Sequence, residues 1–319
     1  MKWSGMMKIQ ELYDGYKGDI TVLLNSVNKG VTAKGAPYLS FSIQDKTGTM
    51  EAKYWGVKEE ALDAYQPGML VELHGDVLSH KNQLQFRVNS AEIKDMDGID
   101  IYEYVKSSAQ SSSELKAQIN AYVASIKNVA IHDLICSFLD EFEKNFYEFP
   151  AATKNHHDYV GGLATHILGM LKLAESITEL YPSLNTDLLY GGVILHDIGK
   201  LIELNKAIVA EYTKEGKLLG HISIMQAMVY ERAHQLEIDG EEVMLLRHMI
   251  LSHHGEYEYG SPVLPMIPEA EILHLIDNID ARMSTLEKAL ANVTPGEFTP
   301  RIFAMENRNF YKAVTKKEN

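Results

Sequence analysis

The stretch DLLYGGVILHDIGK, residues 187–200, places an imidazole and a carboxylate side by side at the end of an apolar run. This pair is His196 and Asp197. Burying such groups without partners costs several kcal/mol, so the apolar surroundings require a hydrogen-bonded network or a metal ion. An isolated His-Asp pair is more often a histidine at a helix end with a capping aspartate, so the rest of the sequence must decide between the two interpretations.

Further histidines and another aspartate also stand at the edges of apolar segments. They are His166, His221, His253, His254 and Asp277. Imidazole and carboxylate ligands suit Mn²⁺, Fe²⁺ or Zn²⁺, and a carboxylate can bridge two ions. The only cysteine, Cys136, has apolar neighbours and is expected to be a buried thiol without chemistry. Because about a helix and a loop separate these elements, the sequence predicts a site assembled from several helices.

The spacing of apolar residues divides the chain into two parts. Five runs rich in β-forming residues are followed by turn residues, and a helix is predicted over 57–65 between the third and fourth of them. The five runs are 20–27, 38–44, 49–55, 69–78 and 83–93. Beyond the serine-rich stretch 107–113 the period changes from two to 3.6. The sequence therefore predicts a multidomain protein, with an N-terminal all-β OB-fold barrel followed by an all-α domain.

The predicted boundaries follow from these patterns. We expect an N-terminal extension (1–18), the barrel (19–95), a linker (96–113), the helical domain (114–313) and a tail (314–319). Met7 is a second plausible start, so Met1 to Met6 are left out of the predicted fold. No apolar run of 18 residues and no signal peptide is found, which predicts a cytoplasmic protein without membrane contact. The sequence gives no indication of an oligomer.

The charge of the chain limits where nucleic acid can bind. A formal net charge of −14 argues against a general polyanion binder, but segments 20–44 and 79–91 contain no Asp or Glu. OB-folds bind oligonucleotides through strands 2 and 3 and through loops 1-2 and 4-5. The candidate contacts are Lys29, Lys34, Tyr38, Lys53, Trp55, His80, Lys81 and Arg87. For Trp55, a partly buried position in the barrel is the alternative.

The order of the polar residues, His, then His-Asp, then further His, then Asp, resembles the HD superfamily of metal-dependent phosphohydrolases. The resemblance implies a first ion held by His166, His196, Asp197 and Asp277. It implies a second ion, bridged by Asp197 and held by His221 and His253, with His254 as an alternative or additional ligand. By the same resemblance Asp197, Lys200 and His221 are the catalytic candidates, with Lys200 contacting phosphate.

Some positions near this pattern leave alternatives open. Asp280 lies one turn after Asp277 and could replace it as a ligand. Gly162 stands where trinuclear relatives carry an acid, so we expect two ions rather than three. Two Mn²⁺ ions are expected, with Fe²⁺, Co²⁺ or Zn²⁺ as alternatives. His156 and His157 are weaker candidates for contact with substrate.

The pairing of the barrel with the HD pattern, from Met7 onward, resembles the YhaM-type 3'-5' exoribonucleases. This resemblance implies hydrolysis of single-stranded RNA from its 3' end to nucleoside 5'-monophosphates, with single-stranded DNA as an alternative partner. Two other functions stay open. One is an HD-type nucleotide phosphohydrolase or cyclic-dinucleotide phosphodiesterase with a regulatory OB-fold, and the other is a non-enzymatic RNA-binding protein.

Overall fold

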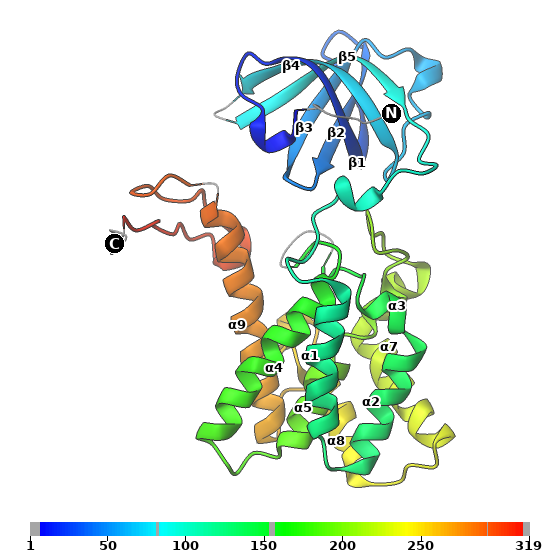
Figure 1. The fold of residues 1–319 in the computed structure, drawn as a ribbon, viewed down its shortest axis with the longest axis vertical. Helices are drawn as coiled ribbons and strands as arrows, with labels where there is room; N and C mark the ends of the chain where they lie inside the picture. The colour runs from blue at the N-terminus through cyan, green and yellow to red at the C-terminus, as the bar shows by residue number, and fades with distance from the viewer. Residues whose placement is uncertain (1–6, 81–82, 153–156, 292, 315–319) are drawn as a thin grey trace. The chain divides into compact units, whose positions relative to one another are not determined.

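A computed structural model describes residues 7–80, 83–152, 157–291 and 293–314. Met1 to Met6, Lys81 and His156, on which sequence predictions fall, lie outside these residues. The chain divides into two compact units, Met1–Ser107 and Ser108–Asn319. Strands make up the first unit and helices the second (Figure 1).

Five strands of the first unit close into a barrel in the order β1-β2-β3-β5-β4. The strands are β1 (Lys17–Val31), β2 (Pro37–Asp45), β3 (Gly48–Trp55), β4 (Leu70–His80) and β5 (Gln83–Ile93). Among the strands that the structure describes, only β3 and β5 pair in parallel. Successive side chains of a strand point to opposite faces, so Leu39, Phe41 and Ile43 are fully buried inside the barrel. The predicted OB-fold is confirmed.

Two local predictions for this unit are wrong. The helix predicted over 57–65 is only a short 3-10 turn, Glu59–Ala61, because Val57 and Tyr65 pack into the barrel core instead of along one helix face. The described part of the predicted extension, from Met7 onward, also packs into the barrel. Ile9 and Leu12 are buried in the barrel core, and the backbone N–H of Ile9 donates to Asp45 Oδ2 at 2.9 Å.

The second unit is helical, as predicted, and has one continuous core. Its α-helices are α1 (Ser112–Ser125), α2 (Val129–Glu141), α3 (Glu143–Phe146), α4 (Gly162–Leu180), α5 (Thr186–Leu195), α6 (Lys200–Glu203), α7 (Lys214–Gln235), α8 (Glu241–Ser252) and α9 (Pro268–Ala291). Among the described residues, no helix is long and apolar enough to cross a membrane.

The serine-rich stretch is more ordered than a linker. Ser111 caps α1 by accepting a hydrogen bond from the backbone N–H of Glu114, and the Glu114 side chain accepts one from the N–H of Ser111. This reciprocal arrangement satisfies donors that a helix start otherwise leaves free. The first helix therefore begins inside the stretch predicted to be a linker.

Helix α5 passes through the middle of the helical unit, in contact with α2, α4, α8 and α9. Every residue from Leu188 to Leu195 is buried, which explains why the sequence is apolar all round here. Gly192 permits this close packing, because a Cβ atom there would lie 2.2 Å from Met249 Cε. The helix ends at Leu195 with His196 as its C-cap, so the His-Asp pair lies in the interior.

Candidate metal centre

The histidines and aspartates selected from the sequence converge at the end of α5. His196 is fully buried and Asp197 is 2% exposed. His166 reaches them from α4, His253 from the end of α8 and Asp277 from α9. His166 Nε2 lies 3.3 Å from Asp277 Oδ1, and His196 Nε2 lies 3.4 Å from Asp197 Oδ2.

Asp197 lies between two groups of imidazoles. Its Oδ2 faces His196 and, at 4.0 Å, Nε2 of His166. Its Oδ1 faces Nε2 of His221 at 3.6 Å and Nε2 of His253 at 3.9 Å. One carboxylate therefore presents each of its two oxygens to a separate pair of nitrogen donors.

The donor atoms in this cluster are oriented for metal coordination. His196 Nδ1 donates to Val193 O at 2.8 Å, and His253 Nδ1 donates to Ile250 O at 2.7 Å. With the proton fixed on Nδ1, the lone pair of each ring lies on Nε2, which points into the cluster. Nε2 of His196, His221 and His253 and Oδ1 of Asp197 are buried and have no hydrogen-bond partner among the described residues. Such buried polar atoms are costly unless an ion binds them, and nitrogen and oxygen donors fit a divalent metal.

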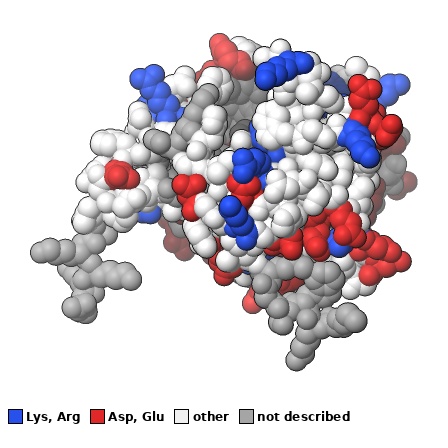
Figure 2. Space-filling view, turned by 90° about the horizontal axis from the view of Figure 1, so that it is seen from above, with Lys and Arg blue, Asp and Glu red and all other residues white. Residues whose placement is uncertain are grey.

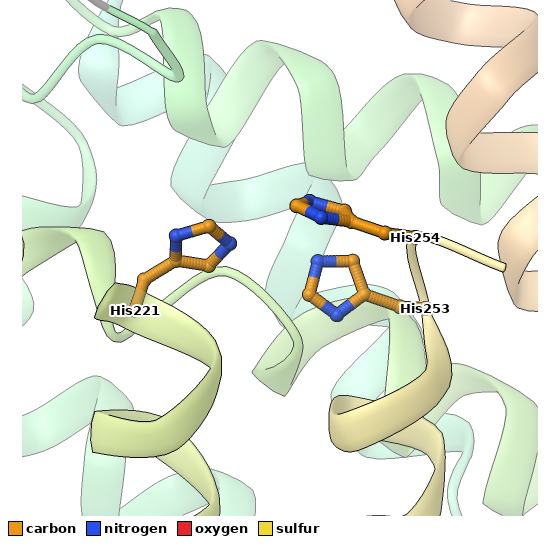
Figure 3. A group of neighbouring side chains, drawn as sticks. All are labelled: His221, His253 and His254. Atoms are coloured by element: carbon orange, nitrogen blue, oxygen red, sulfur yellow. The ribbon is translucent and has the colours of Figure 1, made fainter. Parts of the chain in front are cut away.

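His221 and His254 complete the second side of the cluster. Gly220 takes a positive φ of 72°, which interrupts α7 immediately before His221. The rings of His221, His253 and His254 approach one another from α7 and from the end of α8 (Figure 3). The His221 ring centroid lies 5.7 Å from that of His253 and 5.4 Å from that of His254.

A second layer of side chains fixes His166. Its Nδ1 donates to Asp280 Oδ2 at 2.6 Å, and His157 Nε2 donates to the same oxygen at 2.8 Å. Asp280 thus lies on the outer side of His166, while Asp277 lies on the side of the cluster. A carboxylate behind a ligand histidine orients the ring and increases its basicity.

Sequence reasoning missed Glu203, which performs the same task for His221. Both carboxylate oxygens of Glu203 lie 3.2 Å from His221 Nδ1, and Glu203 is 9% exposed. The signal was present in the run Leu201-Ile202-Glu203-Leu204, where a carboxylate interrupts apolar residues as Asp197 does.

The charges of the cluster depend on one another. Burial opposes ionisation of Asp197, but Lys200 and the neighbouring histidines outweigh it and hold the pKa of the carboxyl well below its usual range. Burial lowers the pKa of His253, and the adjacent His254 lowers it further. Asp197 is therefore a carboxylate and His253 a neutral imidazole, the forms in which both residues bind metals.

Lys200 lies between the cluster and an open cavity. Its Nζ donates to Asp197 Oδ2 at 2.6 Å, which keeps the ammonium beside the cluster. Burial lowers the pKa of Lys200, but the Asp197 charge outweighs burial and raises it overall. Lys200 also lines a cavity of about 390 Å³, together with His254 and Asp277.

Three of the candidate nucleic-acid contacts lie together on the outer face of β2 and β3. Tyr38 pairs with Trp55 across the strands, and their ring centroids are 4.4 Å apart. Lys53 Nζ lies 5.6 Å from the centre of the Tyr38 ring. Trp55 is 47% exposed, so the two rings and the ammonium form a small surface available for stacking.

The other candidates are separate from this surface or already paired. Arg87 donates two hydrogen bonds to the buried carboxylate of Asp76, and Lys29 pairs with Asp63. Lys34 and His80 are exposed. On the face shown in Figure 2, Lys and Arg side chains are scattered between uncharged ones rather than gathered into one patch.

Comparisons with known proteins found a family that matches part of the helical unit and a relative that matches most of the chain. The HD domain family matches residues 163–282. The 3'-5' exoribonuclease YhaM of Geobacillus sp. (strain WCH70) is 45% identical over 301 residues, which cover 94% of this chain and 93% of the relative.

Solved structures similar to part of the chain were also found. The second OB-fold domain of replication protein A from Methanococcus maripaludis has a TM-score of 0.24 and 22% identity, over 28% of this chain and 94% of that one. PriB from Ralstonia solanacearum has a TM-score of 0.21 and 18% identity, over 25% of this chain and 100% of that one.

Proposed function

The chain belongs to the family of the 3'-5' exoribonuclease YhaM, and from this premise we propose that it hydrolyses single-stranded RNA from the 3' end to nucleoside 5'-monophosphates. The observation that carries the proposal is the position of Asp197, whose two oxygens face separate pairs of imidazoles. A shared carboxylate of this kind suits the two-ion sites that cleave phosphodiesters. A cytoplasmic location is part of the proposal.

The HD domain implies dependence on a divalent metal, and the residues at the end of α5 fit one. We assign a first ion to His166, His196, Asp197 and Asp277. A second ion is assigned to Asp197, His221 and His253, with His254 as an additional ligand. Mn²⁺ is the proposed metal, and Fe²⁺, Co²⁺ and Zn²⁺ suit the same donors.

Divalent ions at such a site supply a nucleophile from water at neutral pH and neutralise charge on the reacting phosphate. The protein's own part is positioning. Asp280 and Glu203 orient two of the imidazoles, and Asp197 sets the spacing between the two ligand groups. Lys200 lies beside Asp197 and lines the cavity, so its ammonium is placed to contact a phosphate oxygen.

We propose that the surface formed by Tyr38, Lys53 and Trp55 grips the RNA strand. Stacking of a base on an aromatic side chain is worth about 1–3 kcal/mol and requires no particular sequence. Lys34, His80 and Lys81 are proposed as additional phosphate contacts. Lys29 and Arg87 already pair with carboxylates, and Lys53 lies 3.8 Å from a Glu51 oxygen, which reduces what all three offer to phosphate. Single-stranded DNA presents the same phosphates and bases with similar stacking faces, so it remains part of the proposal.

A time course with 5'-labelled RNA and Mn²⁺ tests this function. An RNA with an unpaired 3' end should shorten progressively from that end, because stacking requires unpaired bases. The same RNA with a stable 3' hairpin should be degraded at least about tenfold more slowly. Equal rates on the two substrates, or equally fast turnover of cyclic dinucleotides and nucleoside triphosphates, would contradict the proposal.

A further inference from the structure

One wall of the cavity beside Lys200 is made by the C-terminal part of the chain. Besides Lys200 and Asp277, the cavity is lined by Arg282 of α9 and by Ala304, Met305 and Glu306. Its volume of about 390 Å³ lies in the range of small-molecule sites. Three residues after Pro300 therefore line a cavity that the proposed metal ligands Asp277 and His254 also line.

Backbone hydrogen bonds hold this C-terminal segment in place. After α9 the chain turns and doubles back, with Thr299 N–H donating to Phe310 O at 2.9 Å and Lys312 N–H donating to Glu297 O at 2.9 Å (Figure 1). Met305 is only 2% exposed and anchors the turn. Glu306 has a φ of 52°, a conformation that residues other than glycine rarely adopt, so the surroundings fix its direction.

The Glu306 carboxylate is held by two guanidinium groups. Arg282 Nη1 and Nη2 donate to its two oxygens at 2.8 and 3.1 Å, and Arg308 Nη2 donates at 2.5 Å. The bond from Arg282 is the main reason why the pKa of Glu306 falls to about 2. At neutral pH Glu306 is therefore a carboxylate that can only accept hydrogen bonds, and it occupies the guanidinium group of Arg282, which lines the same cavity.

We propose that the cavity receives the 3'-terminal nucleotide of the RNA and that Glu306 recognises its free 3'-hydroxyl group. This inference rests on the proposed function. If hydrolysis leaves the phosphate on the released nucleotide, that phosphate lies at the metal centre and its nucleoside occupies one side of it. Residues of the metal centre and Glu306 line the same cavity.

The chemistry of the wall then selects the end of the strand. A 3'-hydroxyl can donate a hydrogen bond to the Glu306 carboxylate, whereas a 3'-phosphate ester lacks that hydroxyl, and Glu306 already holds the guanidinium groups that could bind the phosphate. An internal nucleotide carries a phosphate on the same oxygen and is excluded for the same reason. Glu306 thus acts as a specificity-determining residue that favours removal of single terminal nucleotides.

The test uses the full-length protein with Mn²⁺ and RNA oligomers that differ only at the 3' end. The wild type should cleave the 3'-hydroxyl form with a kcat/KM on the order of 10²-fold above that of the 3'-phosphate form, since sites that bind a hydroxyl discriminate strongly. Glu306→Gln should reduce this ratio at least tenfold, because the amide is uncharged and Arg282 and Arg308 become available to the phosphate. Glu297→Gln, in the same segment but outside the cavity, should keep the wild-type ratio.

Each outcome bears on a different claim. A wild type that cleaves no RNA with either end removes the proposed function itself. A wild type that cleaves RNA but accepts both ends equally overturns only the role of Glu306. The same role is overturned if Glu306→Gln, with wild-type thermal unfolding and wild-type hydrolysis of a small phosphodiester, keeps the full preference for the 3'-hydroxyl.

Discussion

Replacing Asp197 by Asn is expected to abolish hydrolysis of both RNA and a small activated phosphodiester. Asp197 faces both groups of histidines, and an amide has one oxygen where the carboxylate has two. The loss should reach at least about 10²–10³-fold in kcat, the range for removal of one charge-stabilising group. Both substrates should lose activity alike, because the change affects the reaction itself and not the grip on the strand.

The control for this variant is Asp239→Asn, which removes the same charge at an exposed position. It should keep wild-type rates on both substrates. Circular dichroism must first show that Asp197→Asn is folded. RNA cleavage by a folded Asp197→Asn protein with its metal content intact would exclude the shared carboxylate from the reaction.

Removal of residues 1–107 is expected to separate strand binding from hydrolysis. The two compact units meet in the sequence between Ser107 and Ser108. All the proposed metal ligands lie in the second unit. The truncated protein should therefore hydrolyse a small phosphodiester at close to the wild-type rate. It should lose at least about tenfold in kcat/KM on long RNA, since loss of one stacked base costs about 1–3 kcal/mol.

A full-length variant supports the interpretation of this truncation. Tyr38→Ala with Trp55→Ala removes the stacked pair without cutting the chain, and should weaken RNA turnover while leaving small-diester hydrolysis unchanged. Tyr181→Ala, at an exposed aromatic of the helical unit, provides the matched control. If the folded truncated protein degrades long RNA as fast as the full chain, the barrel does not hold the strand.

The fold and the centre of the site could be predicted where neighbouring residues of the sequence form a pattern of apolar and polar side chains. Alternation in β2 and the apolar run of α5 follow directly from burial, so the barrel and the central helix were predictable. His196 and Asp197 stood out because polar residues in an apolar run require partners. The same principle would have identified Glu203.

Other parts depend on contacts that no local pattern records. Asp280 was considered only as a replacement ligand, since its bond to His166 joins residues on different helices. Arg282 and Glu306 meet because the chain doubles back after α9, and a single short segment shows no periodicity. The burial of Ile9 in the barrel core could not be predicted for a similar reason. An isolated apolar residue before the first strand belongs to no periodic pattern.

Metal content measures most directly whether Asp197 joins two ions at one buried centre. The wild-type protein, saturated with Mn²⁺ and freed of excess metal, should retain two ions per chain by elemental analysis, because the donors around Asp197 form two groups. Asp197→Asn should retain fewer. A preparation that cleaves RNA at full rate while holding a single ion per chain at saturation would contradict the two-ion centre.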